Sequence, residues 1–179
     1  IDPLLSIDDI FPIENQDKDF YQSEIEKSVG KKYGSNTEPI IFEVEIIQKT
    51  ENNPYYGKEG ADDETYLIDG DESPVINLSG IDENAKYNYR FDQSDETNVG
   101  HCLKFYYNSN KEGGEYITNV TYSGVPGDTD AYTEILIDKN TPEVLFYQSE
   151  NGNFIGNYII HFKGINNNIH PTGGLVNES

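Results

Sequence analysis

The sequence predicts an all-β fold, a Greek-key β-sandwich preceded by an extended N-terminal arm. Three features support this prediction: apolar and polar residues alternate over several short runs, turn-forming residues recur about every ten residues, and 14 Tyr and 8 Phe provide much of the apolar volume. A chain of 179 residues fits one such domain with extensions, and it is long enough to bury a core without cross-links.

The first 38 residues read as an arm rather than as part of the sandwich. The stretch "IDPLLSIDDIFPI" mixes acids with large apolar residues, and Pro3 and Pro12 disfavour a helix there. A disordered tail would carry fewer apolar residues, so we expect residues 1–38 to dock on another surface. A short helix is expected over residues 23–31, with Gly30 as its stop. The apolar residues expected to make the contact are Leu4, Leu5, Ile7, Ile10 and Phe11.

From residue 39 onward the apolar residues repeat with a period of two, which is typical of strands. In "PIIFEVEIIQK" the alternate residues from Ile40 to Ile46 share one face, and Glu43 and Glu45 point the other way. The sandwich is expected to span residues 39–164, followed by a C-terminal tail over 165–179. Further strands are predicted over residues 65–68, 75–78, 87–91, 103–107, 115–122, 131–137, 144–147 and 157–162, separated by turn formers such as Asp69-Gly70-Asp71.

The charge and composition exclude several classes of partner. A formal net charge of -21 argues against nucleic acid and against anionic membranes, because both need clustered Lys and Arg. No run approaches the roughly 18 apolar residues of a membrane span, so no membrane insertion is expected. The single Cys102 cannot form an internal disulfide. Three sequons, at Asn77, Asn119 and Asn177, permit a glycosylated extracellular protein.

Four stretches in residues 65–158, about half of the chain, resemble the cupredoxin-like domains of marine phage and marine microbial structural and surface proteins. They are "YLIDGDESPVINL", "YRFDQSDETNVGHCLKF", "GGEYITNVTYSGVPGDTDAYTEI" and "TPEVLFYQSENGNFIGNY". The resemblance implies a site in which one His follows a Gly, and a Cys, a second His and a Met follow on a late loop, a ligand set suited to copper. The matching positions here are His101, Ser149, Gly152 and Ile155.

Three of these four positions have lost the side chain that would bind copper. A Ser149 hydroxyl is not a thiolate at neutral pH, and Gly152 and Ile155 offer no donor atom. Cys102 directly follows His101, so in a strand it should point to the opposite side. We therefore expect no copper and no electron transfer, and we expect His101 to pack and form hydrogen bonds in the former ligand pocket.

Other chemistry is weakly represented. No Gly-x-Ser-x-Gly motif and no phosphate-binding loop occurs, and the three His are scattered, so we expect no enzyme activity. Calcium is possible without EF-hand spacing, and exposed tyrosine pairs at residues 55–56 or 106–107 could stack on sugars. The candidate calcium ligands are Asp62, Asp63, Glu64, Asp69 and Asp71.

These expectations favour a non-catalytic structural subunit of an extracellular filament or a virion surface. Its arm would add a strand to an open sheet edge of a neighbouring copy, giving a homo-oligomer or a filament. The virion or extracellular setting is implied by the resemblance alone. The alternative is a sugar-binding or calcium-binding module displayed on a larger assembly.

Overall fold

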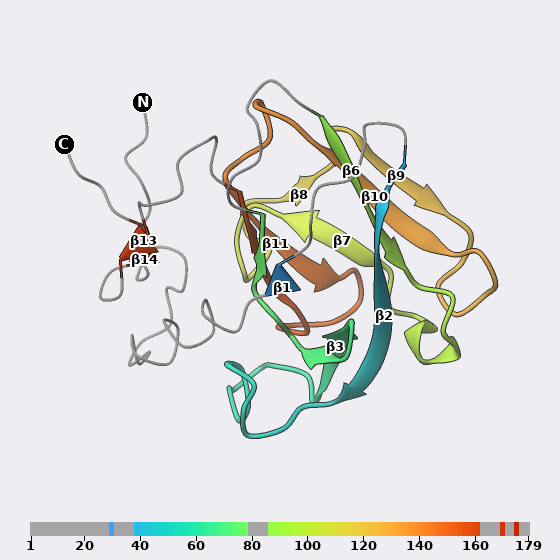
Figure 1. Ribbon diagram of the computed structural model, residues 1–179. Coiled ribbons are helices and arrows are strands. Elements are labelled where there is room, and N and C mark those ends of the chain that lie inside the picture. Colours follow the sequence, from blue (N-terminus) through green and yellow to red (C-terminus); the bar gives the residue numbers. More distant parts are fainter. Residues whose placement is uncertain (1–28, 31–37, 79–85, 162–168, 171–173, 176–179) are drawn as a thin grey trace.

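The computed structural model describes residues 29–30, 38–78, 86–161, 169–170 and 174–175. The described strands form two six-stranded sheets and a separate two-stranded hairpin (Figure 1). One hydrophobic core contains residues from both large sheets. The prediction of an all-β sandwich is confirmed.

The first large sheet, called sheet 1, has the strand order β4-β3-β2-β6-β10-β9. Strands β2 and β6 run parallel, and the other neighbours are antiparallel. The bounds are β4 (Asp71–Glu72), β3 (Glu64–Ile68), β2 (Ile40–Gln48), β6 (Tyr87–Asp92), β10 (Tyr132–Ile137) and β9 (Val120–Ser123).

The second large sheet, called sheet 2, has the order β1-β5-β12-β11-β7-β8. Strand β5 is parallel to both of its neighbours, β1 and β12. Several neighbours, such as β2 and β6 in sheet 1 and β7 and β11 in sheet 2, are far apart in the chain, as in Greek-key connections. The bounds are β1 (Val29–Gly30), β5 (Ile76–Asn77), β12 (Asn157–Ile160), β11 (Val144–Ser149), β7 (Leu103–Tyr106) and β8 (Glu115–Tyr116).

One small hairpin and one helical turn complete the described elements. A 3₁₀ turn, η1 (Glu96–Asn98), lies between β6 and β7, and β13 (Ile169–His170) pairs with β14 (Gly174–Leu175). Among the described residues, no helix is long and apolar enough to cross a membrane.

The core follows from the alternation seen in the sequence. In β2, Phe42, Val44 and Ile46 are buried, whereas the glutamates between them are exposed. Phe42 stacks on Phe91 of the neighbouring strand with ring centroids 5.0 Å apart. In contrast, β11 and β12 are buried at every position, as expected for strands covered on both faces.

Three local predictions need correction. The strand predicted over 115–122 is split into β8 and β9, because Asn119 adopts a left-handed φ of 57° between them. The turn predicted at 69–71 ends one residue earlier: Asp69 and Gly70 both have positive φ, and Asp71 begins β4. The helix predicted over 23–31 is wrong at residues 29–30, whose backbone pairs with β5.

The remainder of the predicted arm and tail lies outside the described residues. This holds for the proposed contact residues Leu4, Leu5, Ile7, Ile10 and Phe11, and for most of residues 165–179. The boundaries at 38/39 and 164/165 therefore stay predictions.

Candidate functional site

The four positions matched to copper ligands come together where the β6–β7 connection meets the β11–β12 loop. His101 lies just before β7, and Ser149 is the last residue of β11. Gly152 and Ile155 follow in the loop that leads to β12. Their approach in space is a consequence of the β7–β11 pairing, in which Ser149 lies opposite Leu103.

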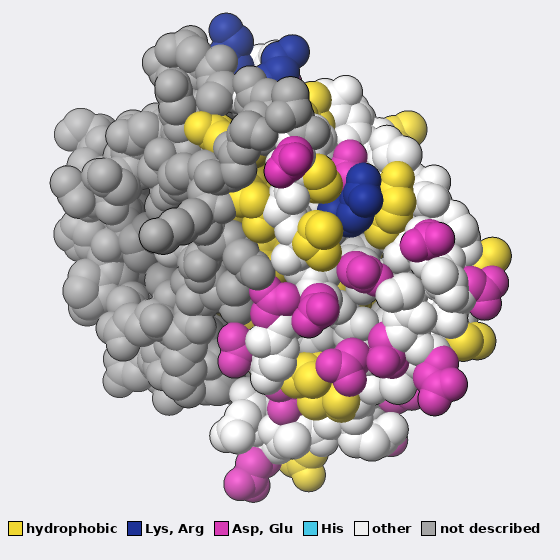
Figure 2. Space-filling view, turned by 45° about the vertical axis from the view of Figure 1, so that its right-hand side comes forward, with side chains coloured by type: hydrophobic (Ala, Val, Ile, Leu, Met, Phe, Trp, Pro, Cys, Tyr) yellow, Lys and Arg dark blue, Asp and Glu magenta, His cyan; other side chains and the backbone are white. Residues whose placement is uncertain are grey.

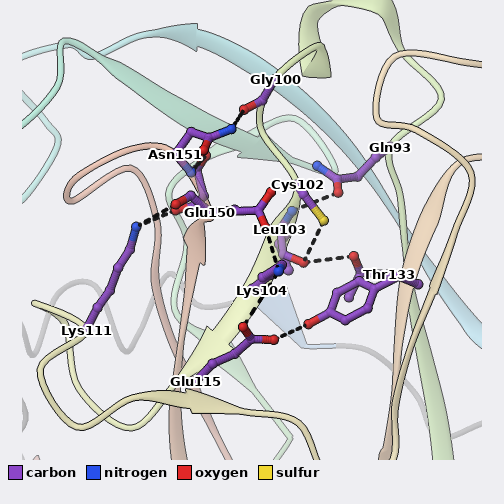
Figure 3. Close-up of polar contacts among 12 residues, drawn as sticks. Gln93, Gly100, Cys102, Leu103, Lys104, Lys111, Glu115, Thr133, Glu150 and Asn151 are labelled. Atoms are coloured by element: carbon purple, nitrogen blue, oxygen red, sulfur yellow. Dashed lines mark hydrogen bonds and ion pairs between the residues drawn. The ribbon is translucent and has the colours of Figure 1, made fainter.

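The backbone around His101 is held by its neighbours. Gly100 adopts a φ of 81°, which turns the chain out of η1 and into β7. The carbonyl of His101 accepts hydrogen bonds from the Tyr66 hydroxyl at 2.8 Å and from Gln93 Nε2 at 2.7 Å. Asn151 Nδ2 donates to the carbonyl of Gly100 at 2.9 Å, an approach visible in Figure 3. The loop therefore has a fixed position relative to both sheets.

Both nitrogens of the His101 ring have partners. Nδ1 lies 3.0 Å from Ser149 Oγ, and Nε2 lies 3.2 Å from Glu64 Oε1. A carboxylate only accepts, so Nε2 carries the proton that is shared with Glu64. In the neutral ring, Nδ1 then accepts from the Ser149 hydroxyl. The imidazole thus links β11 of sheet 2 to β3 of sheet 1.

Ser149, His101 and Glu64 are connected by contacts and have the residue types of a catalytic triad in a hydrolase. In a hydrolase the serine would be accessible to substrate, but here the serine is the buried member. Ser149 is 0% exposed, whereas the Glu64 side chain is 44% exposed. A nucleophilic hydroxyl has to face the substrate. The Ser149 oxygen instead accepts the backbone N–H of Asn151 at 3.2 Å inside the protein. The arrangement is suited to anchoring the loop.

Gly152 and Ile155, the other two matched positions, supply no side-chain donor. A Cβ placed on Gly152 would lie 2.0 Å from Ile155 Cδ1, so the isoleucine occupies the space that a side chain at 152 would need. Ile155 is 0% exposed. The donors left at the four positions are one imidazole and one serine hydroxyl, a set that does not fit copper. Across the described residues, no three His, Cys, Asp or Glu side chains gather to hold a metal.

A lysine ammonium lies against the β11–β12 loop. Lys111 Nζ donates to the carbonyls of Ser149 and Gly152, both at 2.5 Å, and Figure 3 shows it directed at this loop. Burial lowers the pKa of Lys111, and the charges of Asp62 and Glu150 oppose that shift. The ammonium adds a second donor to the Ser149 carbonyl, which also accepts the N–H of Gly152, and it supplies a donor to the Gly152 carbonyl. The sequence offered no sign of this role.

A second polar cluster lies beside Cys102 and joins the edges of the two sheets (Figure 3). Lys104 Nζ lies 2.6 Å from Glu150 Oε1 and 3.6 Å from Glu115 Oε1. Glu115 in β8 also accepts the Tyr122 hydroxyl of β9 at 2.9 Å. The hydrogen bond with Glu150 raises the pKa of Lys104, while burial raises the pKa of the Cys102 thiol. Cys102 is half-buried, and it is not an activated thiolate.

The candidate calcium ligands do not converge. Asp62 and Asp63 precede β3, whereas Asp69 and Asp71 follow it, so the length of the strand separates the two pairs. Asp62 Oδ2 accepts the N–H of Asn153 at 2.9 Å, and Asp69 Oδ1 accepts the N–H of Glu43 at 2.8 Å. Asp62 and Asp69 therefore have local structural roles.

Only one tyrosine of each candidate sugar-binding pair is exposed. Tyr55 and Tyr106 are buried, whereas Tyr56 and Tyr107 are 58% and 50% exposed. The expectation that both members of a pair are exposed is therefore wrong. Tyr107 already packs edge-on against Tyr116, which leaves Tyr56 as the better platform.

The remaining predicted positions that the structure describes lie apart from this site. His161 is buried at the other end of β12, where its Nε2 contacts the carbonyl of Thr141. Asn77 is half-buried in β5, Asn119 is exposed in the turn after β8, and Asn177 lies outside the described residues. Of the three sequons, Asn119 has the geometry of a surface acceptor.

Comparisons with known proteins reveal only a distant likeness in fold. No protein-family model matches the chain, and no curated protein matches it. Among solved structures, a reduced rusticyanin shares 12% identity over 79% of this chain and 93% of its own, with a TM-score of 0.38. Rusticyanin from Thiobacillus ferrooxidans shares 13% identity over 79% of this chain and 91% of its own, with a TM-score of 0.38. The assignment of a two-sheet architecture therefore depends on the strand pairing in the structure and not on these comparisons.

Proposed function

We propose that this chain is a non-catalytic structural subunit of an extracellular filament or a virion-surface assembly. A copper-free, cupredoxin-like sandwich of the kind found in marine phage and microbial proteins forms its body, and the N-terminal arm joins it to neighbouring copies. The donor set at His101, Ser149, Gly152 and Ile155 supports the copper-free part of the proposal. Stoichiometric, tight binding of added copper by the purified chain would contradict that part.

One observation carries the assembly part: the N-terminal segment pairs with a sheet edge. Val29 and Gly30 form β1, which lies parallel to Ile76 and Asn77 at the end of sheet 2. Backbone pairing at an edge depends little on side chains, and it is the interaction by which extended segments bind neighbouring proteins. A segment that occupies an edge in this way is suited to joining subunits.

The described surface suits a subunit that stays soluble before assembly. Figure 2 shows acidic side chains spread over one face, with few basic groups and with hydrophobic groups in small clusters. The formal net charge of -21 gives repulsion between copies, which salt would screen. Contacts that depend on backbone pairing and on the apolar arm can overcome this repulsion at a few defined places.

The test is the mass and shape of the native chain, measured by light scattering and electron microscopy on one sample. A polymer or a large regular particle is expected, and deletion of residues 1–13 should abolish it while the sandwich stays folded. A matched control keeps the arm length but replaces "LLSIDDIF" by a Gly/Ser segment, and it should behave like the deletion. A monomer of 20.3 kDa for the native chain at all salt concentrations would overturn the proposal.

A second candidate function is a sugar-binding module, and one cavity favours it. Tyr56 lines a cavity of about 450 Å³ together with polar and charged groups from the β2–β3 connection. An exposed aromatic ring beside hydrogen-bonding groups is the usual composition of a sugar subsite. The other lining residues are Gln48, Lys49, Tyr55, Gly57, Lys58, Ala61, Asp62 and Asp63.

This second function predicts a monomer that binds glycans. Binding to an array of glycans should be lost in Tyr56→Ala and retained in Tyr107→Ala, whose ring lies outside the cavity. Calcium, the other ligand considered, should raise the melting temperature if it binds the native state. A monomer that binds no glycan and is unaffected by calcium would exclude this alternative.

A further inference from the structure

The structure points to β5 as the acceptor edge and to β1 as the donor strand, and we propose that β1 is exchanged between copies. In this exchange, Val29–Gly30 of one copy occupies the edge of sheet 2 in the next copy. The inference rests on the proposed structural function, and it specifies which segment and which edge make the contact. It differs from an assembly in which residues 4–11 are the only residues that contact the neighbouring copy.

The pairing of β1 makes an exchange possible because so little binds it to its own chain. β1 is two residues long, and among the described strands its only partner is β5. Its register places Val29 against Ile76 and Gly30 against Asn77. The same register can form with a β5 strand from another copy at no loss of hydrogen bonds, which is the condition for strand exchange.

The chain on either side of β1 is long enough for the exchange. Residues 31–39 connect Gly30 in sheet 2 to Ile40 in sheet 1, and a connection of this length can span roughly 30 Å when extended. Its sequence, "KKYGSNTEP", contains Gly34, Ser35 and Asn36, which are common in turns and hinges. Residues 1–28 precede β1, so an exchanged β1 would carry the apolar arm to the same neighbour.

The acceptor edge is the side of β5 that faces away from β12, and β1 is the described strand that pairs with it. β5 pairs on its other side with β12, where Ile159 and Ile160 lie opposite Ile76 and Asn77. Without β1, no described strand would cover this side of β5, next to a buried core residue, Ile76. Donation from each copy to the next fills every acceptor edge and produces an open chain, whereas mutual donation would close a dimer.

Cross-linking of mixed variants tests the exchange. In a Cys102→Ser background, Gly30→Cys protein and Asn77→Cys protein are unfolded together, refolded and allowed to assemble, and then treated with a short bismaleimide. Exchange should give a covalent product of about twice 20.3 kDa that contains one chain of each kind. The control mixes Thr121→Cys with Glu134→Cys, neighbours across the β9–β10 pair within one sandwich, and should give no such product.

Variants that carry both cysteines in one chain show whether the β1–β5 contact forms within a chain or between chains. Gly30→Cys/Asn77→Cys should cross-link between chains in assembled material, whereas Thr121→Cys/Glu134→Cys should cross-link within the chain. Assembled material in which Gly30→Cys/Asn77→Cys cross-links only within the chain would overturn the exchange and leave the proposed function standing. Absence of assembly in the Cys102→Ser chain and in the native chain would instead reject both.

A second measurement does not depend on the cysteine variants. Val29→Pro/Gly30→Pro removes two backbone N–H groups from β1, whereas Val29→Ala/Gly30→Ala keeps them. Under the exchange, the proline variant should remain monomeric with a folded sandwich, and the alanine variant should assemble. Normal assembly of the proline variant would show that residues 1–28 join the copies without β1.

Discussion

Nδ1 of His101 lies 3.0 Å from Oγ of Ser149, and these residues occupy two of the positions that the sequence resemblance assigned to copper ligands. The distance is that of an ordinary hydrogen bond. A contact between two side chains therefore occupies two of the four matched positions. The remaining ring nitrogen contacts Glu64, so the histidine bridges the two sheets.

Replacing Ser149 by Ala should destabilise the protein by about 1 to 2 kcal/mol, because two part-buried hydrogen bonds lose their partner. His101→Ala should have a similar effect, and the double variant should cost less than the sum of the two. Urea unfolding of the four proteins measures this coupling. Thr121→Ala, at an exposed position, is the control with little expected change. Strictly additive effects of the two substitutions would contradict a direct interaction.

The positions of this site were available from the sequence, but most of its contacts were not. The resemblance aligned His101, Ser149, Gly152 and Ile155, and the strand pairing brings them together. The partner of the histidine, Glu64, was noted only as a calcium candidate. A single sequence does not indicate which of 33 acidic residues approaches a given ring, because the contact joins strands of different sheets.

The strands were predictable because their physical cause is local. Alternation along β2 and the apolar runs of β11 and β12 reflect which faces are buried. β1 was missed because two residues carry no period, and its pairing with β5 depends on residues more than forty positions away. The split between β8 and β9 was missed because left-handed Asn119 resembles any other polar residue on the exposed face of a strand.

Gly152→Ala should be destabilising through overpacking, by about 1 to 3 kcal/mol, because the added Cβ would lie 2.0 Å from Ile155 Cδ1. Ile155→Val removes that methyl group and should cost about 0.5 to 1.5 kcal/mol by itself. In the double variant, the valine removes the contact at 2.0 Å and leaves the one with Cγ1 at 2.9 Å, so the combined loss should be smaller than the sum. Thermal unfolding of all four proteins measures this. A combined loss equal to the sum would mean that Ile155 does not limit the size of residue 152.

Lys111→Met should destabilise the β11–β12 loop, because the carbonyls of Ser149 and Gly152 lose their ammonium donor. The Ser149 carbonyl keeps the N–H of Gly152, but a part-buried acceptor that loses its donor, as the Gly152 carbonyl does, costs about 1 to 3 kcal/mol. Hydrogen exchange at residues 149–156 should become faster, since the loop opens more often. The control is Lys139→Met at an exposed position, which removes the same charge. Unchanged exchange in the loop of Lys111→Met would show that the ammonium does not hold it.

Asp95 caps η1, the turn that precedes His101 in the chain, and we expect its contribution to stability to depend on pH. Its carboxylate caps η1 by accepting the N–H of Thr97 at 2.9 Å and the Thr97 hydroxyl at 2.6 Å. These hydrogen bonds hold the pKa of Asp95 below its ordinary value of 3.8. The same Thr97 hydroxyl oxygen accepts the N–H of Ile46, so the cap connects η1 to β2.

The sign of the pH dependence follows from that lowered pKa. The folded state binds the Asp95 proton more weakly than the unfolded state, so the stabilisation is fully present above the unfolded pKa and is lost as pH falls through the folded pKa. Asp95→Ala should therefore lower stability at pH 7, and its difference from the native chain should shrink below about pH 4. Asp95→Asn can still cap η1 without titrating, and its advantage over Asp95→Ala should persist at low pH. Urea unfolding at several pH values checks both variants, and an Asp95→Ala deficit that stays constant down to about pH 3 would exclude an ionised cap.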